Sequence, residues 1–320
     1  MNKVLETAWH IKEKSQQVTI DEQALAVFSR KLIEDGIGIP PWNYDYHFFD
    51  GGKETVAYLF LLDSINFCFW PKTGTDKWQV QYKSETLSGY YALAASLKKA
   101  IESGIPITDA NYLAELTLDK LKQVLGGNGE LQLIEERVHI LNELGEFLIN
   151  KYNGDANKLV ESAENSALKL VKLLVENLPS FRDEAEYYGA TIYFYKRSQI
   201  FAADLYGAFA GKEWGFFKDM DSLTVFADYK LPQVLRHVGI LQYSPSMEHK
   251  VDHGIFLESG SPEEIEIRAN TIWAVELIRQ ELTEMGKKLR AFEIDWILWN
   301  LGQERKFKAK PYHKTVTIYY

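Results

Sequence analysis

Apolar residues recur at every third or fourth position over long stretches of this 320-residue chain, and this periodicity limits its possible folds. In the middle of the sequence, one periodic run extends from Leu131 to Leu148 and another from Ala167 to Leu178. This spacing is typical of amphipathic α-helices, and Pro179 is expected to end the second helix. The middle of the chain is therefore predicted to be helical.

Local signals at helix starts extend this prediction to both ends of the chain. Thr19 and Glu22 fit a capping box, which predicts a helix directly after them. Ser261 is expected to cap a further helix, because Pro262 suits the first helical position and Glu264 completes a second capping box. These patterns predict long helices near the beginning and near the end of the sequence.

The remaining segments add further helices and a little β-structure. Residues 84–101 and about 292–305 are predicted to be helical, while residues 55–70 fit either a strand or a buried helix. The alternating tail, residues 315–320, suggests a short edge strand. The chain has no internal repeat or obvious linker. We therefore predict a mainly α fold with minor β, organised as a single domain over residues 1–320.

The charge balance of the chain restricts its possible ligands. The net charge is −9, and an acidic protein repels a phosphate polymer unless its basic residues are clustered. The nearest approach to a basic cluster is Lys306, Lys308, Lys310 and Lys314, which suffices for one phosphate group. A small-molecule partner is thus favoured over polymeric nucleic acid.

Cysteine usage and hydropathy indicate the expected compartment. The single cysteine, Cys68, excludes an intramolecular disulfide and a metal site with several cysteines, and its aromatic surroundings predict a buried thiol. Residues 1–15 are charged, and no stretch approaches the ~18 uninterrupted apolar residues of a membrane span. We expect a soluble cytoplasmic protein with no membrane partner.

Asp228 is the first candidate for chemistry, in the segment Phe226-Ala227-Asp228-Tyr229. Pro232 shortly after it predicts the start of a helix, so Asp228 is a candidate helix cap. The alternative is a carboxylate at the wall of a pocket, beside Phe226 and Tyr229. Both interpretations remain open at this stage.

A second candidate group lies near the C-terminus. If residues 292–305 form a helix, Trp296 and Asn300 share one face, and Asp295 lies about 100° from them. Such a face is able to stack on a planar ring and to bind its polar edge. An ordinary amphipathic helix with core tryptophans has the same pattern.

Two buried polar residues are expected in the N-terminal third. His47 lies among aromatic residues, where a histidine usually has a structural role. Asp63 lies within the apolar segment 55–70, so it needs polar partners if it is buried.

Two further patterns concern phosphate and metal. The basic pair Lys196 and Arg197 follows an aromatic run and is a candidate phosphate site, or else a solvated helix face. His249 and His253 have the spacing of zinc ligands on a helix, but the weakly apolar context favours a surface turn. No metal site is predicted.

Several segments together resemble one known family, the queuosine salvage proteins, which are queuosine 5′-phosphate N-glycosidases. The resemblance spans nearly the whole chain and keeps the same order of segments. The segments that carry it are residues 61–70, 194–200, 226–233, 294–299 and 311–320.

This resemblance implies a helical domain related to the DNA glycosylase (helix-hairpin-helix) superfamily. It also implies hydrolysis of queuosine 5′-monophosphate to queuine and ribose 5-phosphate, for tRNA modification, without a cofactor. On the family pattern Asp228 is the catalytic carboxylate. Phe226, Asp295 and Trp296 would line the base pocket, with His47 and Asn300 also contributing.

The chemistry of that reaction matches these residues. Cleavage of an N-glycosidic bond builds positive charge on the ribose, which a fixed carboxylate stabilises. A helix start tends to keep Asp228 ionised, which suits this role or nucleophilic attack better than proton donation. The leaving 7-deazapurine has no N7 to protonate, so it must be stabilised at its other edges. The alternatives are a base-excision glycosylase acting on nucleic acid and a non-catalytic nucleotide- or tRNA-binding module.

Overall fold

A computed structural model describes residues 2–320 and confirms the mainly helical prediction. The α-helices are α1 (Lys3–Lys14), α2 (Glu22–Glu34), α3 (Lys53–Ser64), α4 (Tyr90–Glu102), α5 (Ala110–Ala114), α6 (Leu118–Leu125), α7 (Ile134–Tyr152), α8 (Ala156–Ser162), α9 (Ala167–Asn177), α10 (Lys196–Ala208), α11 (Lys230–His237), α12 (Pro245–Asp252), α13 (Pro262–Glu284) and α14 (Ala291–Leu301). The 3-10 turns are η1 (Pro179–Phe181), η2 (Glu213–Gly215), η3 (Met220–Ser222) and η4 (Arg305–Lys308). Within the described residues, no helix has the length and apolar character needed to cross a lipid bilayer.

The β-structure consists of three small antiparallel pairs. Strand β1 (Val18–Ile20) pairs with β6 (Leu241–Tyr243), β2 (Gln79–Tyr82) with β3 (Glu85–Ser88), and β4 (Glu184–Tyr187) with β5 (Ala190–Tyr193). The β1–β6 pair joins segments more than 200 residues apart, with Val18 opposite Tyr243. The minor β content predicted from the sequence is therefore confirmed.

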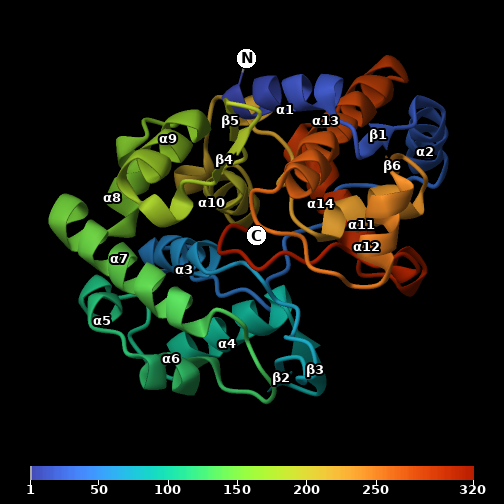
Figure 1. Ribbon diagram of the computed structural model, residues 1–320. Coiled ribbons are helices and arrows are strands. Elements are labelled where there is room, and N and C mark those ends of the chain that lie inside the picture. The colour runs from blue at the N-terminus through green and yellow to red at the C-terminus, as the bar shows by residue number, and fades with distance from the viewer. Residues whose placement is uncertain (1) are drawn as a thin grey trace.

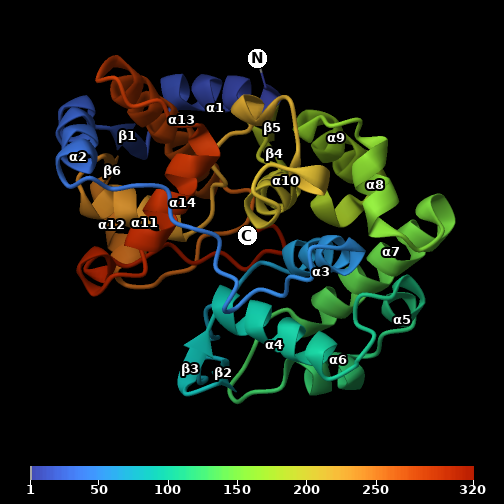
Figure 2. The ribbon, with the colours of Figure 1, turned by 180° about the vertical axis from the view of Figure 1, so that it is seen from behind.

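Two hydrophobic clusters build the interior. One is centred on α3, α4, α7 and α10, and the other on α1, α11, α13 and α14. Figure 1 shows these two groups of helices on opposite sides of the molecule. The C-terminal residue lies near the middle in both Figure 1 and the reverse view of Figure 2. Residues that line a site between the two groups therefore come from distant parts of the sequence.

Helix α3 resolves the ambiguity of residues 55–70. The chain is helical up to Ser64 and then continues without regular structure through Trp70. Nine residues of α3 are buried, so neighbouring elements surround the helix. A helix buried on all sides loses its apolar stripe, which is why periodicity alone does not distinguish it from a strand. Cys68 is buried as predicted.

Several predicted helix ends agree with the structure. The Ser261 hydroxyl accepts a hydrogen bond from the Glu264 N–H, and Pro262 occupies the first position of α13. Helix α9 ends just before Pro179. Helix α14 begins as predicted but ends at Leu301 rather than near residue 305.

Three local predictions were wrong. Asp21, not Thr19, caps α2, because Thr19 belongs to strand β1. Residues 85–88 form β3, so the helix predicted from residue 84 begins only at Tyr90. Residues 315–317 alternate between buried and exposed, as in an extended chain, but the tail 315–320 pairs with no strand among residues 2–320. Its terminal carbonyl, on Tyr320, instead accepts a hydrogen bond from the Cys68 N–H.

A buried ion pair connects Asp183, between η1 and β4, to helix α13. Both guanidinium Nη atoms of Arg268 donate to the Asp183 carboxylate, at 2.9 and 2.7 Å. The guanidinium also lies between the rings of Phe194 and Tyr320, 3.9 and 4.3 Å from their centroids. Both partners are almost fully buried, so loss of one would leave an uncompensated charge in the interior.

We predict that Arg268→Met lowers the free energy of unfolding by about 3–5 kcal/mol, because Asp183 would be left buried without its partner. The control is Arg279→Met, which breaks a more exposed pair with Glu276 on the same helix and should cost about 0–1 kcal/mol. Urea denaturation measures both values. Equal losses in the two variants would contradict the role given to the Arg268–Asp183 pair.

Candidate active site

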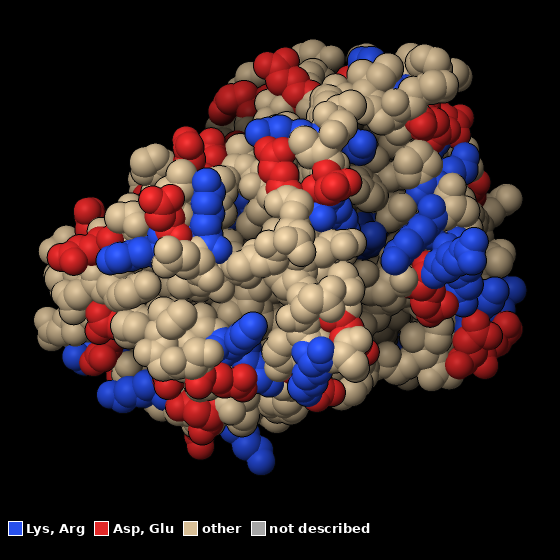
Figure 3. Space-filling view, turned by 90° about the horizontal axis from the view of Figure 1, so that it is seen from below, with Lys and Arg blue, Asp and Glu red and all other residues tan. Residues whose placement is uncertain are grey.

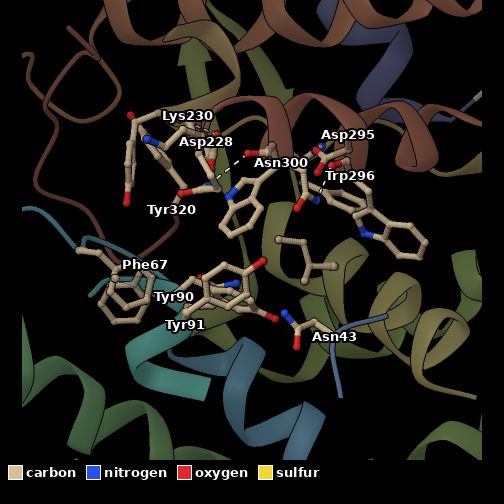
Figure 4. A pocket seen from close by; sticks show the side chains of 18 of the residues that line it. Asn43, Phe67, Tyr90, Tyr91, Asp228, Lys230, Asp295, Trp296, Asn300 and Tyr320 are labelled. Carbon is tan, nitrogen blue, oxygen red and sulfur yellow. Dashed lines mark hydrogen bonds between the residues drawn. The ribbon is translucent and has the colours of Figure 1, made fainter. Parts of the chain in front are cut away.

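A cavity of about 1090 Å³ opens where the two groups of helices meet. Its walls combine carboxyl groups, lysines and aromatic rings, several of which are seen in Figure 4. The polar and aromatic residues that matter for the site are Trp42, His47, Asn66, Lys77, Tyr90, Lys196, Asp204, Phe226, Asp228, Tyr229, Lys230, Asp295, Trp296, Trp299, Asn300, Lys308 and Lys314.

The structure places Asp228 in this cavity at the start of α11. One carboxylate oxygen, Oδ1, accepts hydrogen bonds from the N–H groups of Lys230 at 2.7 Å and Leu231 at 2.9 Å. The side chain therefore satisfies free N–H groups of the first helical turn, as a cap does. It also faces the cavity, so the two interpretations made from the sequence are compatible. The second carboxylate oxygen is left for a ligand.

The ionisation of Asp228 reflects opposing effects. Burial raises the pKa of its carboxyl, while the charge of Lys196 and the N–H groups of Leu231 and Lys230 lower it. The sequence led us to expect that the helix start would keep this carboxylate ionised. The structure adds a desolvation effect that the sequence did not reveal, and the cation of Lys196 compensates for part of it.

Lys196 and Arg197, predicted together as a phosphate site, have different positions. Lys196 lines the cavity, and its Nζ donates to the Asn66 carbonyl at 3.0 Å. Burial lowers the pKa of Lys196 to about 8, against the opposing charge of Asp228. Arg197 does not line the cavity, and its guanidinium donates to the carbonyls of Ser64 and Ser180. Its geometry is that of a buried structural residue rather than a phosphate ligand.

Asp295 lies on α14 and is nearly fully buried at the cavity wall. Its Oδ2 accepts a hydrogen bond from the Phe226 N–H at 2.8 Å, which joins α14 to the segment that carries Asp228. Burial raises the pKa of Asp295 well above its usual range, and the nearby Asp228 raises it further. Asp295 is therefore suited to bind a polar edge of a ligand in its neutral form.

Aromatic rings form the flat walls of the cavity. Trp42 and Trp296 both lie close to Gly207, where a Cβ would be 2.7 Å from one indole and 3.1 Å from the other. The Tyr229 ring packs against Tyr312, with centroids 4.9 Å apart. The indole N–H of Trp42 has no partner among residues 2–320. Such walls fit a planar heterocycle with hydrogen-bonding edges.

Asn300 lies at the exposed side of the cavity. Its amide donates to the Trp296 carbonyl one turn earlier, at 2.8 Å. Figure 4 shows Asp295, Trp296 and Asn300 together on one wall, opposite Tyr90 and Asn43. The predicted arrangement on α14 therefore does bring its polar and aromatic groups to one cavity.

His47 has the structural role predicted for it and also lies at the cavity, as the family resemblance implied. It is 4% exposed and lines the cavity, yet both ring nitrogens have partners. Nδ1 lies 2.7 Å from the Asn43 carbonyl, and Nε2 lies 2.9 Å from the Tyr90 hydroxyl. Burial lowers the pKa of His47 to about 4. His47 is thus a neutral histidine with satisfied hydrogen bonds at the cavity wall.

The two histidines with zinc-like spacing have another environment. Their rings are in contact at a tilt of 38°, with centroids 4.1 Å apart, and the nearby carboxylates of Glu248 and Asp252 are paired with Arg236. Among residues 2–320, no group of three potential ligands is arranged to hold a metal ion. His249 and His253 therefore lie outside the site described above.

The cavity residues that were not singled out from the sequence include Tyr90, Asp204 and Lys230. Asp204 follows Lys196 and Ile200 at intervals of four on α10, so these three residues face one side of the helix. This four-residue spacing in the sequence could have indicated that Asp204 lies on the same side of the helix as Lys196. Tyr90 reaches the cavity from α4, more than 100 residues earlier in the chain, and no local pattern marks it.

Comparison with known proteins identifies a family that matches this geometry. A family model described as queuosine salvage protein matches residues 46–320. A protein of Sphaerobacter thermophilus is 44% identical over 317 residues, which cover 99% of this chain and 97% of that protein. Relatives from Bos taurus and Schizosaccharomyces pombe are 38% and 32% identical and cover 98% and 99% of this chain, with 98% and 96% of their own lengths. All three are named queuosine 5′-phosphate N-glycosylase/hydrolase.

Proposed function

Since this chain belongs to the queuosine salvage protein family, we propose that it hydrolyses the N-glycosidic bond of queuosine 5′-phosphate. The products are queuine and ribose 5-phosphate, and queuine becomes available for tRNA modification. Within this chain, the N-glycosidase function is supported by the Asp228 carboxylate, which two N–H groups fix in a cavity with aromatic walls. No cofactor is needed for this hydrolysis.

Asp228 is the proposed catalytic carboxylate. Departure of the base leaves positive charge at C1′ of the ribose, and a carboxylate held beside C1′ stabilises that charge. The hydrogen bonds to Oδ1 fix the side chain and leave Oδ2 to face the sugar. Both electrostatic stabilisation and nucleophilic attack at C1′ are compatible with this position.

The base is proposed to lie between the aromatic walls. Phe226, Tyr229 and Trp296 offer ring faces, while Asp295 and Asn300 offer polar groups to the edges of the base. His47 contributes to the opposite wall. The neutral form of Asp295 can both donate and accept a hydrogen bond, which suits the guanine-like edge of queuine.

The 5′-phosphate is proposed to lie beside lysines at the mouth of the cavity. Lys77, Lys230 and Lys308 line it, and Lys308 and Lys77 each lower the pKa of Lys230 by like-charge repulsion, after the larger effect of burial. A bound phosphate would relieve this repulsion. Lys308 belongs to the basic group noted near the C-terminus.

We propose one domain over residues 1–320, related in fold to the helix-hairpin-helix DNA glycosylases, in a cytoplasmic protein that acts on a free nucleotide rather than on polymeric nucleic acid. In Figure 3, the basic side chains are interspersed with acidic ones on the face drawn. Together with the net charge of −9, this distribution disfavours binding along a nucleic-acid backbone.

We predict that Asp228→Asn lowers kcat for queuosine 5′-phosphate by about 10²–10³-fold or more, because the charge that stabilises C1′ is lost. Queuine release, followed by mass spectrometry, measures the rate. The control, Asp221→Asn, changes an exposed carboxylate and should keep the wild-type rate. Full turnover by Asp228→Asn would remove Asp228 from the mechanism, and an inactive wild-type protein would refute the N-glycosidase assignment.

We predict that Lys308→Ala raises KM for queuosine 5′-phosphate roughly tenfold, as expected for one charged contact to phosphate, and leaves the hydrolysis of unphosphorylated queuosine unchanged. The matched control is Lys306→Ala, because Lys306 pairs with Glu304 and does not line the cavity. Steady-state kinetics with both substrates tests this assignment. Equal effects of Lys308→Ala on the two substrates would exclude a phosphate contact.

A further inference from the structure

The mechanism proposed above leaves one chemical requirement open, which is the stabilisation of the departing base. When the glycosidic bond breaks, the base takes the electron pair, and a 7-deazapurine has no N7 to receive a proton. An acid in the cavity that protonates another nitrogen of the base would promote its departure. Asp228 serves the sugar, so the acid must be another residue.

Asp204 is a carboxyl group at the cavity wall that the mechanism has not used. It lies on α10, two turns after Lys196, and is 5% exposed. Behind it lies Asp63, which is fully buried and has no N–H or O–H partner for either carboxylate oxygen among residues 2–320. Asp63 lies near Asp204, whose charge raises the pKa of Asp63 further after the larger effect of burial. Two adjacent buried carboxyl groups must hold at least one proton.

A chain of hydrogen bonds continues from Asp204 along the wall. Its Oδ2 lies 3.3 Å from the Tyr90 hydroxyl, which in turn lies 2.9 Å from Nε2 of His47. Nδ1 of His47 lies 2.7 Å from the Asn43 carbonyl. Tyr90 and Asn43 are both visible on this side of the cavity in Figure 4.

The directions of these bonds place a proton on Asp204. A carbonyl only accepts, so Nδ1 of His47 carries a hydrogen. Because burial keeps His47 neutral, its Nε2 accepts, and the single proton of the Tyr90 hydroxyl is donated to it. The Tyr90 oxygen then faces Asp204 with lone pairs only. An ionised Asp204 would have to compete with His47 for the single Tyr90 proton, whereas a protonated Asp204 donates to Tyr90 and both contacts are satisfied.

Asp295 lacks such a chain, although it is also a buried carboxyl group in the cavity. Its Oδ2 accepts from the Phe226 N–H, and a backbone amide does not pass a proton on. Asp204, by contrast, lies 3.3 Å from a hydroxyl and near a second carboxyl group, both of which exchange protons.

We propose that Asp204 is the general acid that protonates the departing base, and that Tyr90 and His47 are positioning residues that keep its proton in place. This proposal rests on the N-glycosidase function proposed above. In the step, the C1′–N bond breaks and its electron pair passes to the base. The Asp204 O–H proton then transfers to a nitrogen of the base. Water supplies the hydroxyl to C1′, and its remaining proton restores Asp204.

The first test compares two leaving groups. Asp204→Asn keeps the shape of the side chain and an N–H donor but has no proton to transfer. We expect it to lower kcat for queuosine 5′-phosphate by about 10²–10⁴-fold. The loss should be under about tenfold for 4-nitrophenyl riboside 5-phosphate, whose leaving group departs as a stable anion and needs little acid catalysis. Asp228→Asn should lose activity on both substrates.

The second test, the pH profile of kcat/KM for queuosine 5′-phosphate, needs no analogue. Burial raises the pKa of Asp204 to about 7, against the opposing charge of Lys196. The acid form is thus lost as the pH rises through about 7, and wild-type activity should fall there. Asp204→Asn should lack this fall. The other ionisable groups that face Asp204 are Tyr58 and Asp295.

The outcomes separate this proposal from the function on which it rests. A wild-type protein inactive on queuosine 5′-phosphate would refute the function itself. With an active wild type, full activity of Asp204→Asn, or equal losses on both substrates with an unchanged melting temperature, would overturn the role of Asp204. If Asp204→Asn does not fold, Tyr90→Phe serves instead. It should show a smaller loss confined to queuosine 5′-phosphate, and equal losses on both substrates would overturn the proposal.

Discussion

The buried pair between Arg268 and Asp183 is the interaction on which the site depends. Asp183 accepts two bonds from Arg268, and its Oδ2 also accepts from the N–H of Lys196, at the first residue of α10. Arg268 further donates, through Nε, to the carbonyl of Ala227, directly before Asp228. One guanidinium thus fixes the start of the helix that carries Lys196 and Asp204 relative to the loop that carries Asp228. A cavity built from distant segments needs such a fixed connection to keep catalytic groups in register.

The electrostatics of the cavity follow from the burial of several carboxyl groups beside one lysine. Burial raises the pKa of Asp204, Asp228 and Asp295, while the charge of Lys196 lowers the pKa of each. The groups differ in their hydrogen bonds. Asp228 accepts two N–H bonds that favour its ionised form, whereas Asp204 adjoins Asp63 and Tyr90. Different environments thus assign a charged role to one carboxyl group and an acid role to another, as in other glycosidases.

The sequence predicted the features that depend on local patterns. Helices α9 and α13 were predicted from their apolar spacing and their caps. The position of Asp228 at a helix start was predicted from Pro232 shortly after it. The chain did not reveal contacts between distant residues, such as Tyr90 with Asp204. From their adjacency in the sequence, Lys196 and Arg197 were predicted to form one phosphate site. Successive residues on a helix point about 100° apart, so Lys196 faces the cavity and Arg197 faces the core.

In the proposed mechanism, Asp228 lies beside C1′ of a nucleotide held between the aromatic walls. The most direct test is a crystal structure of the Asp228→Asn variant with queuosine 5′-phosphate bound. We expect this structure to show C1′ within roughly 3.5 Å of the side chain at position 228, the base between Phe226 and Trp296, and the phosphate beside Lys230 and Lys308. A ribose bound away from position 228, with the phosphate beside Lys196, would contradict this mechanism.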